Sequence, residues 1–322
     1  MKTLFKKILI VIGKYLGTLI LAVLIFVIGA ICIFEQGPST QIRDLFVVTV
    51  QQSSAAKPLA KLFLSDETVA KIMEDNSTKD EDIISAGDVI EIDDTLDKSL
   101  ITIEDIVGPT YDGKLMIVND PSRISVYCID LNSEHGTTVK KAVKSQEALG
   151  GINGGGFADK AGTGSGNEPL GIVVSNGKWV FGESNGRTSL IGFDKDDKLV
   201  VGYMTATQAK ERGIRDAVSW NPPLIVDGEI IERKGDGGLN PRTAIGQRAD
   251  GAVLLLVING RRVDCIGASY SDIAGIMKDH GAVIAGNLDG GNSSAMVYDG
   301  ELISRPSSLN GERDIPTFFL VK

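Results

Sequence analysis

The sequence predicts an α+β fold, a mixed, mostly β-sheet domain with a few packed helices, and three observations support this prediction. Many short runs are rich in β-branched residues and are separated by Gly, Asn and Asp, which is typical of strands joined by turns. A few helix-forming stretches begin at Ser or Thr and end at Gly, as capped helices do. Hydrophobic residues make up 43% of the 322 residues, which is ordinary for a globular protein.

Each element follows from its local pattern. The expected strands are residues 114–118, 124–129, 171–174, 189–193, 198–203, 253–258, 282–288 and 317–321. The expected helices run, from cap to end, from Thr137 or Thr138 to Gly150, from Thr205 to Gly213, and from Ser269 or Ser271 through Met277 to near Gly281.

The N-terminal region contains one long apolar segment. Residues 15–34 carry no charge, and about 20 such residues span a hydrocarbon core as a helix. Lysines precede this segment and acidic residues follow it, so we expect residues 1–14 to be cytoplasmic and the rest extracytoplasmic, in a single-pass plasma membrane protein. A cleaved signal peptide is the alternative. A lipoprotein is disfavoured because Ile31 precedes Cys32 where a small residue is expected.

Three further regions follow the apolar segment. Residues 35–76 alternate apolar clusters with helix formers and are predicted to form a helical stalk, with Ser65 as a helix cap. Residues 77–100 are acidic and poor in apolar residues, which predicts a solvated linker. Its acidic residues are Asp80, Glu81, Asp82, Asp88, Glu91, Asp93, Asp94 and Asp97. Residues 101–322 then form the main domain.

Charge and composition exclude several classes of function. The net charge of −9 and the absence of a basic run after the N-terminal lysines argue against a nucleic-acid partner. Two histidines and three cysteines provide neither a typical zinc site nor a disulfide framework. Cys128 and Cys265 are either bridged or buried free thiols. We expect no metal and no cofactor.

One carboxylate stands out as a site residue. Asp289 ends an apolar strand and is followed by Gly290, Gly291, Asn292, Ser293 and Ser294. Glycines let the backbone turn and approach a ligand closely, so this arrangement can hold a carboxylate beside a substrate. The alternative is that Asp289 only caps the glycine turn.

Five motifs in the C-terminal part occur jointly and in order. They are NGGGF at 153–157, PPLIVDG at 222–228, PRT at 241–243, LDGG at 288–291 and RDIPT at 313–317. In these motifs the chain from about residue 150 to 322 resembles the phosphodiester glycosidase family. The resemblance implies an enzyme that hydrolyses the bond between a sugar and a phosphodiester.

The resemblance assigns expected roles to several residues. Asp289 serves as nucleophile, general base or electrostatic stabiliser, and Arg242 grips the phosphate with its planar guanidinium. Asn153 presents its amide to sugar hydroxyls, while the N–H groups of Gly154, Gly155 and Gly156 receive an anion. The other expected substrate-binding residues are Thr243, Asp159, Glu168, Gly290, Gly291, Ser293 and Ser294, with Asp159 and Glu168 as alternatives for a second carboxylate.

We therefore expect a membrane-anchored extracytoplasmic hydrolase that cleaves a sugar-1-phosphodiester in a cell-envelope or exopolysaccharide glycan. Its partners would be that glycan or sugar-phosphodiester substrate and the membrane. A non-catalytic glycan-binding module in polysaccharide assembly is the alternative from another class. Cleavage of the P–O bond is a third possibility, although such enzymes usually use a metal or a covalent nucleophile.

Overall fold

The computed structural model describes residues 2–53, 55–77, 83–159, 164–182, 186–233, 235–308 and 310–322. The chain divides into two compact units, Met1–Asp75 and Asn76–Lys322. Asp80, Glu81 and Asp82 of the expected linker lie outside the described residues, as do residues 160–163 beside the first glycine motif.

The N-terminal unit is helical. It consists of α1 (Lys2–Gln36), α2 (Thr40–Gln51), a 3-10 turn (Lys57–Lys61) and α3 (Asp66–Asp75). Ser39 and Ser65 cap α2 and α3 through bonds from the backbone N–H groups of Ile42 and Thr68. Valines of α2 pack with Ala60 and with Val69 and Ile72 of α3 in a small core. Helices therefore occupy the region predicted as a stalk.

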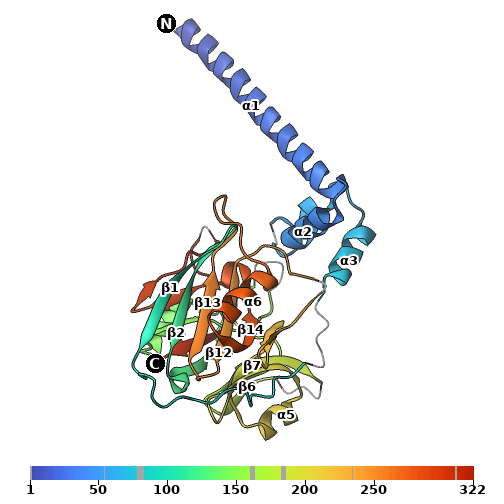
Figure 1. Ribbon diagram of the computed structural model, residues 1–322. Coiled ribbons are helices and arrows are strands. Elements are labelled where there is room, and N and C mark those ends of the chain that lie inside the picture. The colour runs from blue at the N-terminus through green and yellow to red at the C-terminus, as the bar shows by residue number, and fades with distance from the viewer. Residues whose placement is uncertain are drawn as a thin grey trace. The chain divides into compact units, whose positions relative to one another are not determined.

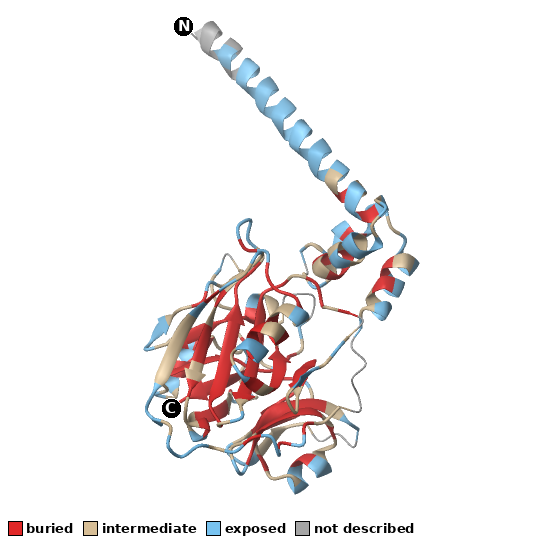
Figure 2. Cartoon of the chain, viewed as in Figure 1, coloured by how far each residue is buried: buried red, intermediate tan, exposed pale blue. Residues whose placement is uncertain are grey.

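Most of the described residues of α1 (Figure 1) are exposed, as Figure 2 shows, and those after Lys14 are mostly apolar. Residues Ile10–Gln36 have a mean hydropathy of 3.0 and are long enough to cross a bilayer. A membrane anchor and a signal sequence both have this length and composition.

The C-terminal unit is built on three sheets, and every strand pairing within its described residues is antiparallel. The largest sheet has the order β1-β2-β13-β12-β14-β10-β11. Its strands are β1 (Ile101–Val107), β2 (Asp112–Val118), β13 (Val253–Ile258), β12 (Arg242–Arg248), β14 (Ala282–Leu288), β10 (Pro223–Val226) and β11 (Glu229–Ile230).

The two smaller sheets have five strands each. The second sheet contains β16 (Glu301–Leu302), β15 (Met296–Tyr298), β4 (Gly150–Asn153), β17 (Thr317–Val321) and β3 (Ile124–Cys128), in that order. The third contains β6 (Lys178–Phe181), β5 (Val173–Ser175), β9 (Ile214–Val218), β7 (Thr188–Asp194) and β8 (Leu199–Met204).

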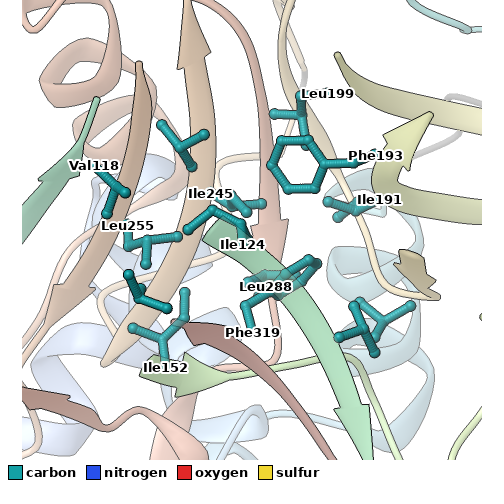
Figure 3. Packing of buried hydrophobic residues seen from close by; sticks show 14 of the residues in the cluster. Val118, Ile124, Ile152, Ile191, Phe193, Leu199, Ile245, Leu255, Leu288 and Phe319 are labelled. Atoms are coloured by element: carbon teal, nitrogen blue, oxygen red, sulfur yellow. The ribbon is translucent and has the colours of Figure 1, made fainter. Parts of the chain in front are cut away.

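Strand β13 shows how the large sheet is buried on both faces. Val253, Leu255 and Val257 point into the main core, whereas Leu254, Leu256 and Ile258 point into a second core under a helix. This alternation follows from the two-residue period of a strand. In the main core, Ile245 and Leu288 of the large sheet pack with side chains of the other two sheets, as Figure 3 shows.

Three helices cover these sheets. They are α4 (Val139–Ser145), α5 (Ala206–Glu211) and α6 (Tyr270–Asp279), and Thr138, Thr205 and Ser269 cap them as predicted. Thr205 and Ser269 complete capping boxes with Gln208 and Asp272. The apolar side of α6 closes the second core over β12, β13 and β14 (Figure 1). The α+β fold class is confirmed.

The described part of the acidic segment is not the solvated linker that we predicted. Ile84 forms a bridge with Gly202, and the backbone of Glu91 donates to Ala249. Ile90 is fully buried in the main core. The acidic side chains among the described residues of this segment are exposed. The composition therefore did not reveal that Ile90 and several backbone bonds fix residues 83–93 to the domain.

Two further details concern the cysteines and the strands that the sequence analysis did not predict. Cys128 and Cys265 are free thiols, so the bridge between them is not formed. Strands β1, β4, β6, β9, β10, β11, β15 and β16 were not among those predicted.

Candidate active site

The candidate site lies where the ends of β4, β12 and β14 meet. Thr243 of β12 pairs with Leu288 of β14 in the large sheet. The next residue, Asp289, donates its backbone N–H to Gly154 O at 3.2 Å, just after β4 of the second sheet. Thr243 and Asp289 follow Gly154 by about 90 and 135 positions in the sequence. All three residues nevertheless meet at one junction between two sheets.

Asp289 is the ionisable group at this junction. Its Oδ1 accepts the N–H of Gly290 at 3.0 Å, and the Ser293 hydroxyl donates to the same carboxyl group. Burial of the carboxyl raises its pKa to about 6, while those two donors and the charge of Arg313 act in the opposite direction. A perturbed carboxyl held by a glycine turn fits a catalytic role.

Asn153 does not present its amide to a ligand as we expected. Its side chain is fully buried, and Nδ2 donates to the backbone oxygen of Asp289 at 2.6 Å. Its Oδ1 accepts from Thr243 Oγ1 at 2.7 Å and from Ala295 N at 3.2 Å. Asn153 and Thr243 therefore position the backbone at Asp289 from behind the site.

The glycines that follow Asn153 do not form an anion-binding nest. Gly154 and Gly155 donate their N–H groups to the carbonyl and hydroxyl oxygens of Thr317, and Gly156 donates to Ser219 O. A Cβ at Gly156 would overlap the Trp220 ring. The run is rich in glycine because two neighbouring segments, at Thr317 and at residues 218–220, approach its backbone closely. The sequence alone did not distinguish this reason from ligand binding.

The glycines after Asp289 do form a tight turn. Gly291 has a φ of +63° and donates to Pro241 O at 2.9 Å. A 3-10 turn, Gly291–Ser293, follows and brings the Ser293 hydroxyl back to Asp289. Ser294 is buried, and its hydroxyl has no hydrogen-bond partner among the described residues.

Arg242 is committed to the protein and does not offer the fork that we expected for phosphate. Its side chain is 4% exposed. Nε donates to Ala268 O at 3.1 Å, and Nη2 donates to Gly237 O and Gly238 O at 2.5 and 2.8 Å. The guanidinium also stacks over Tyr270, 4.2 Å from the ring centre. It holds two loops against the start of β12.

The two candidates for a second carboxylate differ in position. Asp159 forms an ion pair of 2.7 Å with Arg313, and the charges of both residues act on Asp289. Arg313 also lies over Phe157, which belongs to a buried apolar cluster. Glu168 is exposed, and the tie that joins it to this region is a bond from Ala158 N to its backbone oxygen. Asp159, not Glu168, stands beside Asp289.

Two arginines at the site were not among the predicted site residues. Arg313 belongs to the motif at 313–317, so that motif was a signal for it. Arg261 lies beside Gly291 and is close enough to Asp289 for their charges to interact. A positive φ of +57° at Arg261 is not visible in a sequence. Within the described residues, no group of three or more His, Cys, Asp or Glu side chains is arranged to hold a metal ion.

Comparisons with known proteins identify the family of this chain. A model of the phosphodiester glycosidase family matches residues 146–322. The chain is 28% identical over 197 residues to bovine (Bos taurus) N-acetylglucosamine-1-phosphodiester alpha-N-acetylglucosaminidase. That alignment covers 54% of this chain and 36% of the bovine protein, so the chain spans about a third of that relative's length.

Solved structures show the same fold. The catalytic domain of the zebrafish N-acetylglucosamine-1-phosphodiester alpha-N-acetylglucosaminidase, auto-inhibited by its pro-peptide, superposes with a TM-score of 0.58 at 27% identity. The superposition covers 69% of this chain and 82% of that domain. An exported-protein structure from Burkholderia pseudomallei matches at a TM-score of 0.50 and 19% identity, over 66% of this chain and 74% of its own, and shows the fold alone.

The fold is that of a phosphodiester glycosidase domain. The family match covers more than half of the chain, and the chain belongs to the phosphodiester glycosidase family.

Proposed function

We propose that this protein hydrolyses the bond between the anomeric carbon of a sugar and a phosphodiester oxygen. The observation that carries the proposal is the carboxyl group of Asp289, which the junction of two sheets holds beside Ser293 in a partly desolvated setting. The bovine and zebrafish relatives are named for N-acetylglucosamine-1-phosphodiester. That sugar is the first substrate to test.

The chemistry suits a single ionised carboxylate. A phosphodiester leaves without a proton at neutral pH, so the transition state needs mainly charge stabilisation and positioning. With a pKa of about 6, Asp289 is mostly ionised at pH 7 and can stabilise positive charge at the anomeric carbon. Water completes the reaction, which releases the free sugar and a phosphate monoester.

The backbone around the carboxylate is pre-organised. Asn153 fixes the Asp289 carbonyl, Gly290 N–H fixes one carboxyl oxygen, and Ser293 contacts the same group. The buried Ser294 hydroxyl offers a further donor to a sugar oxygen. Rigid support of this kind lowers the reorganisation that accompanies charge development.

The reaction is tested by following labelled oxygen from water into the products of an N-acetylglucosamine-1-phosphodiester. Label in the sugar at C1 is expected. Label in the phosphate would show attack at phosphorus and contradict the proposal. No cleavage across a panel of sugar-1-phosphodiesters, with measurable glycan binding, would indicate a binding module.

A matched pair of substitutions assigns the reaction to the site. Asp289→Asn should abolish turnover, whereas Asp299→Asn should not, because Asp299 lies in an exposed turn where a positive φ of +51° suits asparagine equally well. Equal activity of the two variants would remove Asp289 from the mechanism.

The domain is further proposed to be held outside the cytoplasmic membrane by α1, as an envelope or exopolysaccharide enzyme. The exposed apolar surface of α1 and the lysines that precede its apolar part support this location. Protease added to intact spheroplasts should digest the domain and leave a membrane-bound N-terminal fragment. Release into the medium of a protein that lacks the N-terminal apolar segment would instead indicate a cleaved signal sequence.

A further inference from the structure

A phosphodiester substrate carries a negative charge beside the bond to be cleaved, and three arginines near Asp289 are held by different kinds of partner. Arg242 donates hydrogen bonds from Nε and Nη2 to backbone carbonyl oxygens, and its guanidinium stacks over the Tyr270 ring. Arg313 is paired with the carboxylate of Asp159. Arg261 is oriented by side-chain amides: Nη1 donates to Asn292 Oδ1 at 2.9 Å, and Nη2 donates to Asn240 Oδ1 at 3.3 Å. Both of these acceptors are neutral amide oxygens, and they fix the direction of the guanidinium.

The backbone at Arg261 is held in an uncommon conformation. Its φ of +57° is left-handed, a region that a long side chain adopts at some expense in free energy and that clusters at functional sites. A bond of 2.9 Å from its N–H to Ile266 O and a bridge between Arg262 and Cys265 close the loop around it. The loop thereby directs this side chain toward Gly291.

The turn after Asp289 is shaped to receive the guanidinium. A Cβ at Gly291 would lie 3.0 Å from Arg261 Nη2, so a larger residue would crowd the contact. Ser307 Oγ donates to the same Asn292 Oδ1 at 2.8 Å and steadies that acceptor. The carboxylate and the guanidinium therefore sit on the two sides of one rigid turn.

The charges around Arg261 favour an anion. Burial and the neighbouring Arg242 lower the pKa of Arg261, and Asp289 opposes them. Because the charge of Arg242 repels that of Arg261, an anion bound at Arg261 would offset that repulsion. A phosphodiester carries a negative charge next to the bond that is cleaved in the proposed reaction.

We propose that Arg261 binds the phosphate of the substrate and makes the site specific for phosphodiester leaving groups. This inference rests on the proposed function. Asp289 faces the anomeric carbon, Arg261 binds the departing phosphate oxygens, and Arg242 supports the loops without contacting them. The role that we expected for Arg242 thus passes to a residue 19 positions further along the chain.

The test compares two substrates with the same sugar, a 1-phosphodiester and a nitrophenyl glycoside, whose leaving group has no phosphate. Arg261→Lys and Arg261→Gln should lower kcat/KM for the phosphodiester about 10- to 100-fold, the range for losing a hydrogen bond to a charged group. Turnover of the nitrophenyl glycoside should change less than about threefold. Arg262→Lys and Arg262→Gln are the matched controls, because Arg262 is the exposed neighbour that pairs with Asp264, and they should leave both substrates unaffected.

Inorganic phosphate serves as a probe that does not depend on turnover. It should inhibit or bind the full-length protein in calorimetry, and the Arg261 variants should weaken that binding while the Arg262 variants should not. Urea unfolding of each variant completes the test: removing the charge beside Arg242 should leave stability equal or higher, whereas a purely structural arginine would lose stability.

The outcomes separate this inference from the function on which it rests. If the unaltered protein cleaves neither substrate, the proposed function fails. If it cleaves the phosphodiester and the Arg261 variants keep that activity, or lose activity on both substrates equally, the phosphate role of Arg261 is wrong. Unchanged phosphate binding in Arg261→Gln would overturn it as well.

Discussion

The Thr243 hydroxyl donates a hydrogen bond of 2.7 Å to Asn153 Oδ1, and this contact joins the large sheet to the second sheet directly behind Asp289. Both side chains are fully buried. The polar pair is thus part of the framework that sets where the carboxylate stands.

Replacing Asn153 by alanine should destabilise the fold and inactivate the site together. The substitution leaves the Thr243 hydroxyl, Ala295 N–H and Asp289 carbonyl without this partner, and the expected loss is roughly 2–4 kcal/mol of unfolding free energy. Urea unfolding measures it. Asn132→Ala, at an exposed turn, should change stability by less than about 0.5 kcal/mol. Similar small effects of both substitutions would contradict the framework role.

Asp289→Asn should stabilise the protein at pH 8 but not near pH 4. The pKa of Asp289 in the folded protein, about 6, lies above its ordinary value of 3.8. As pH rises through this window, the unfolded chain releases the proton first, so the folded state loses stability and the full penalty is present above pH 6. Removing the charge should recover roughly 1–3 kcal/mol at pH 8. An equal difference at both pH values in urea unfolding would refute this origin of the shift.

Activity should depend on the same ionisation. Because the proposed reaction uses the carboxylate, kcat/KM for a sugar-1-phosphodiester should fall as pH drops below about 6, by about tenfold per pH unit. The Asp299→Asn control should retain the profile. Activity that instead rises on acidification would assign Asp289 the role of a general acid.

Residues 83–93 should be needed for a stable domain. A chain that begins at Asn76 should unfold cooperatively, whereas one that begins at Ile101 should lose stability because Ile90 leaves the main core. Ile90→Ala should cost roughly 2–4 kcal/mol in the full-length protein, and Val89→Ala, at the exposed neighbour, should cost much less. Equal stability of the two truncated chains would restore the linker interpretation.

Two glycines should respond oppositely to alanine. Gly156→Ala should destabilise the domain because the new methyl group would overlap Trp220. Gly275→Ala should stabilise it by about 0.5–1 kcal/mol, since this position in α6 has open space and alanine favours a helix. Thermal unfolding of both variants, beside the unaltered protein, decides. A neutral Gly156→Ala would reopen a ligand role for that glycine run.

The sequence was sufficient for features that depend on local chemistry. Strand periodicity, Ser and Thr caps and the glycine turn after Asp289 depend on residues that are close together in the sequence. The α+β class and the position of that carboxylate at a strand end could therefore be predicted. The partners of Asn153 were not predictable, because Thr243, Asp289 and Ala295 are far away along the chain. Arg242 bonds to the nearby Gly237 and Gly238 as well as to Ala268, and the loop path that brings those carbonyl groups to its side chain is not visible in the sequence. Arg261 was missed for a related reason: its left-handed backbone is set by a loop closed through Ile266.

The backbone hydrogen bonds of residues 83–93 determine where the chain that leaves the N-terminal unit is attached to the C-terminal unit. Any tension along the chain enters at the bonds to β8 and to Ala249 and Asp250, which follow the end of β12 opposite Arg242. Those backbone bonds therefore lie at the end of β12 away from the turn after Asp289. If α1 is the anchor proposed above, the domain is attached to it on the side away from its carboxylate.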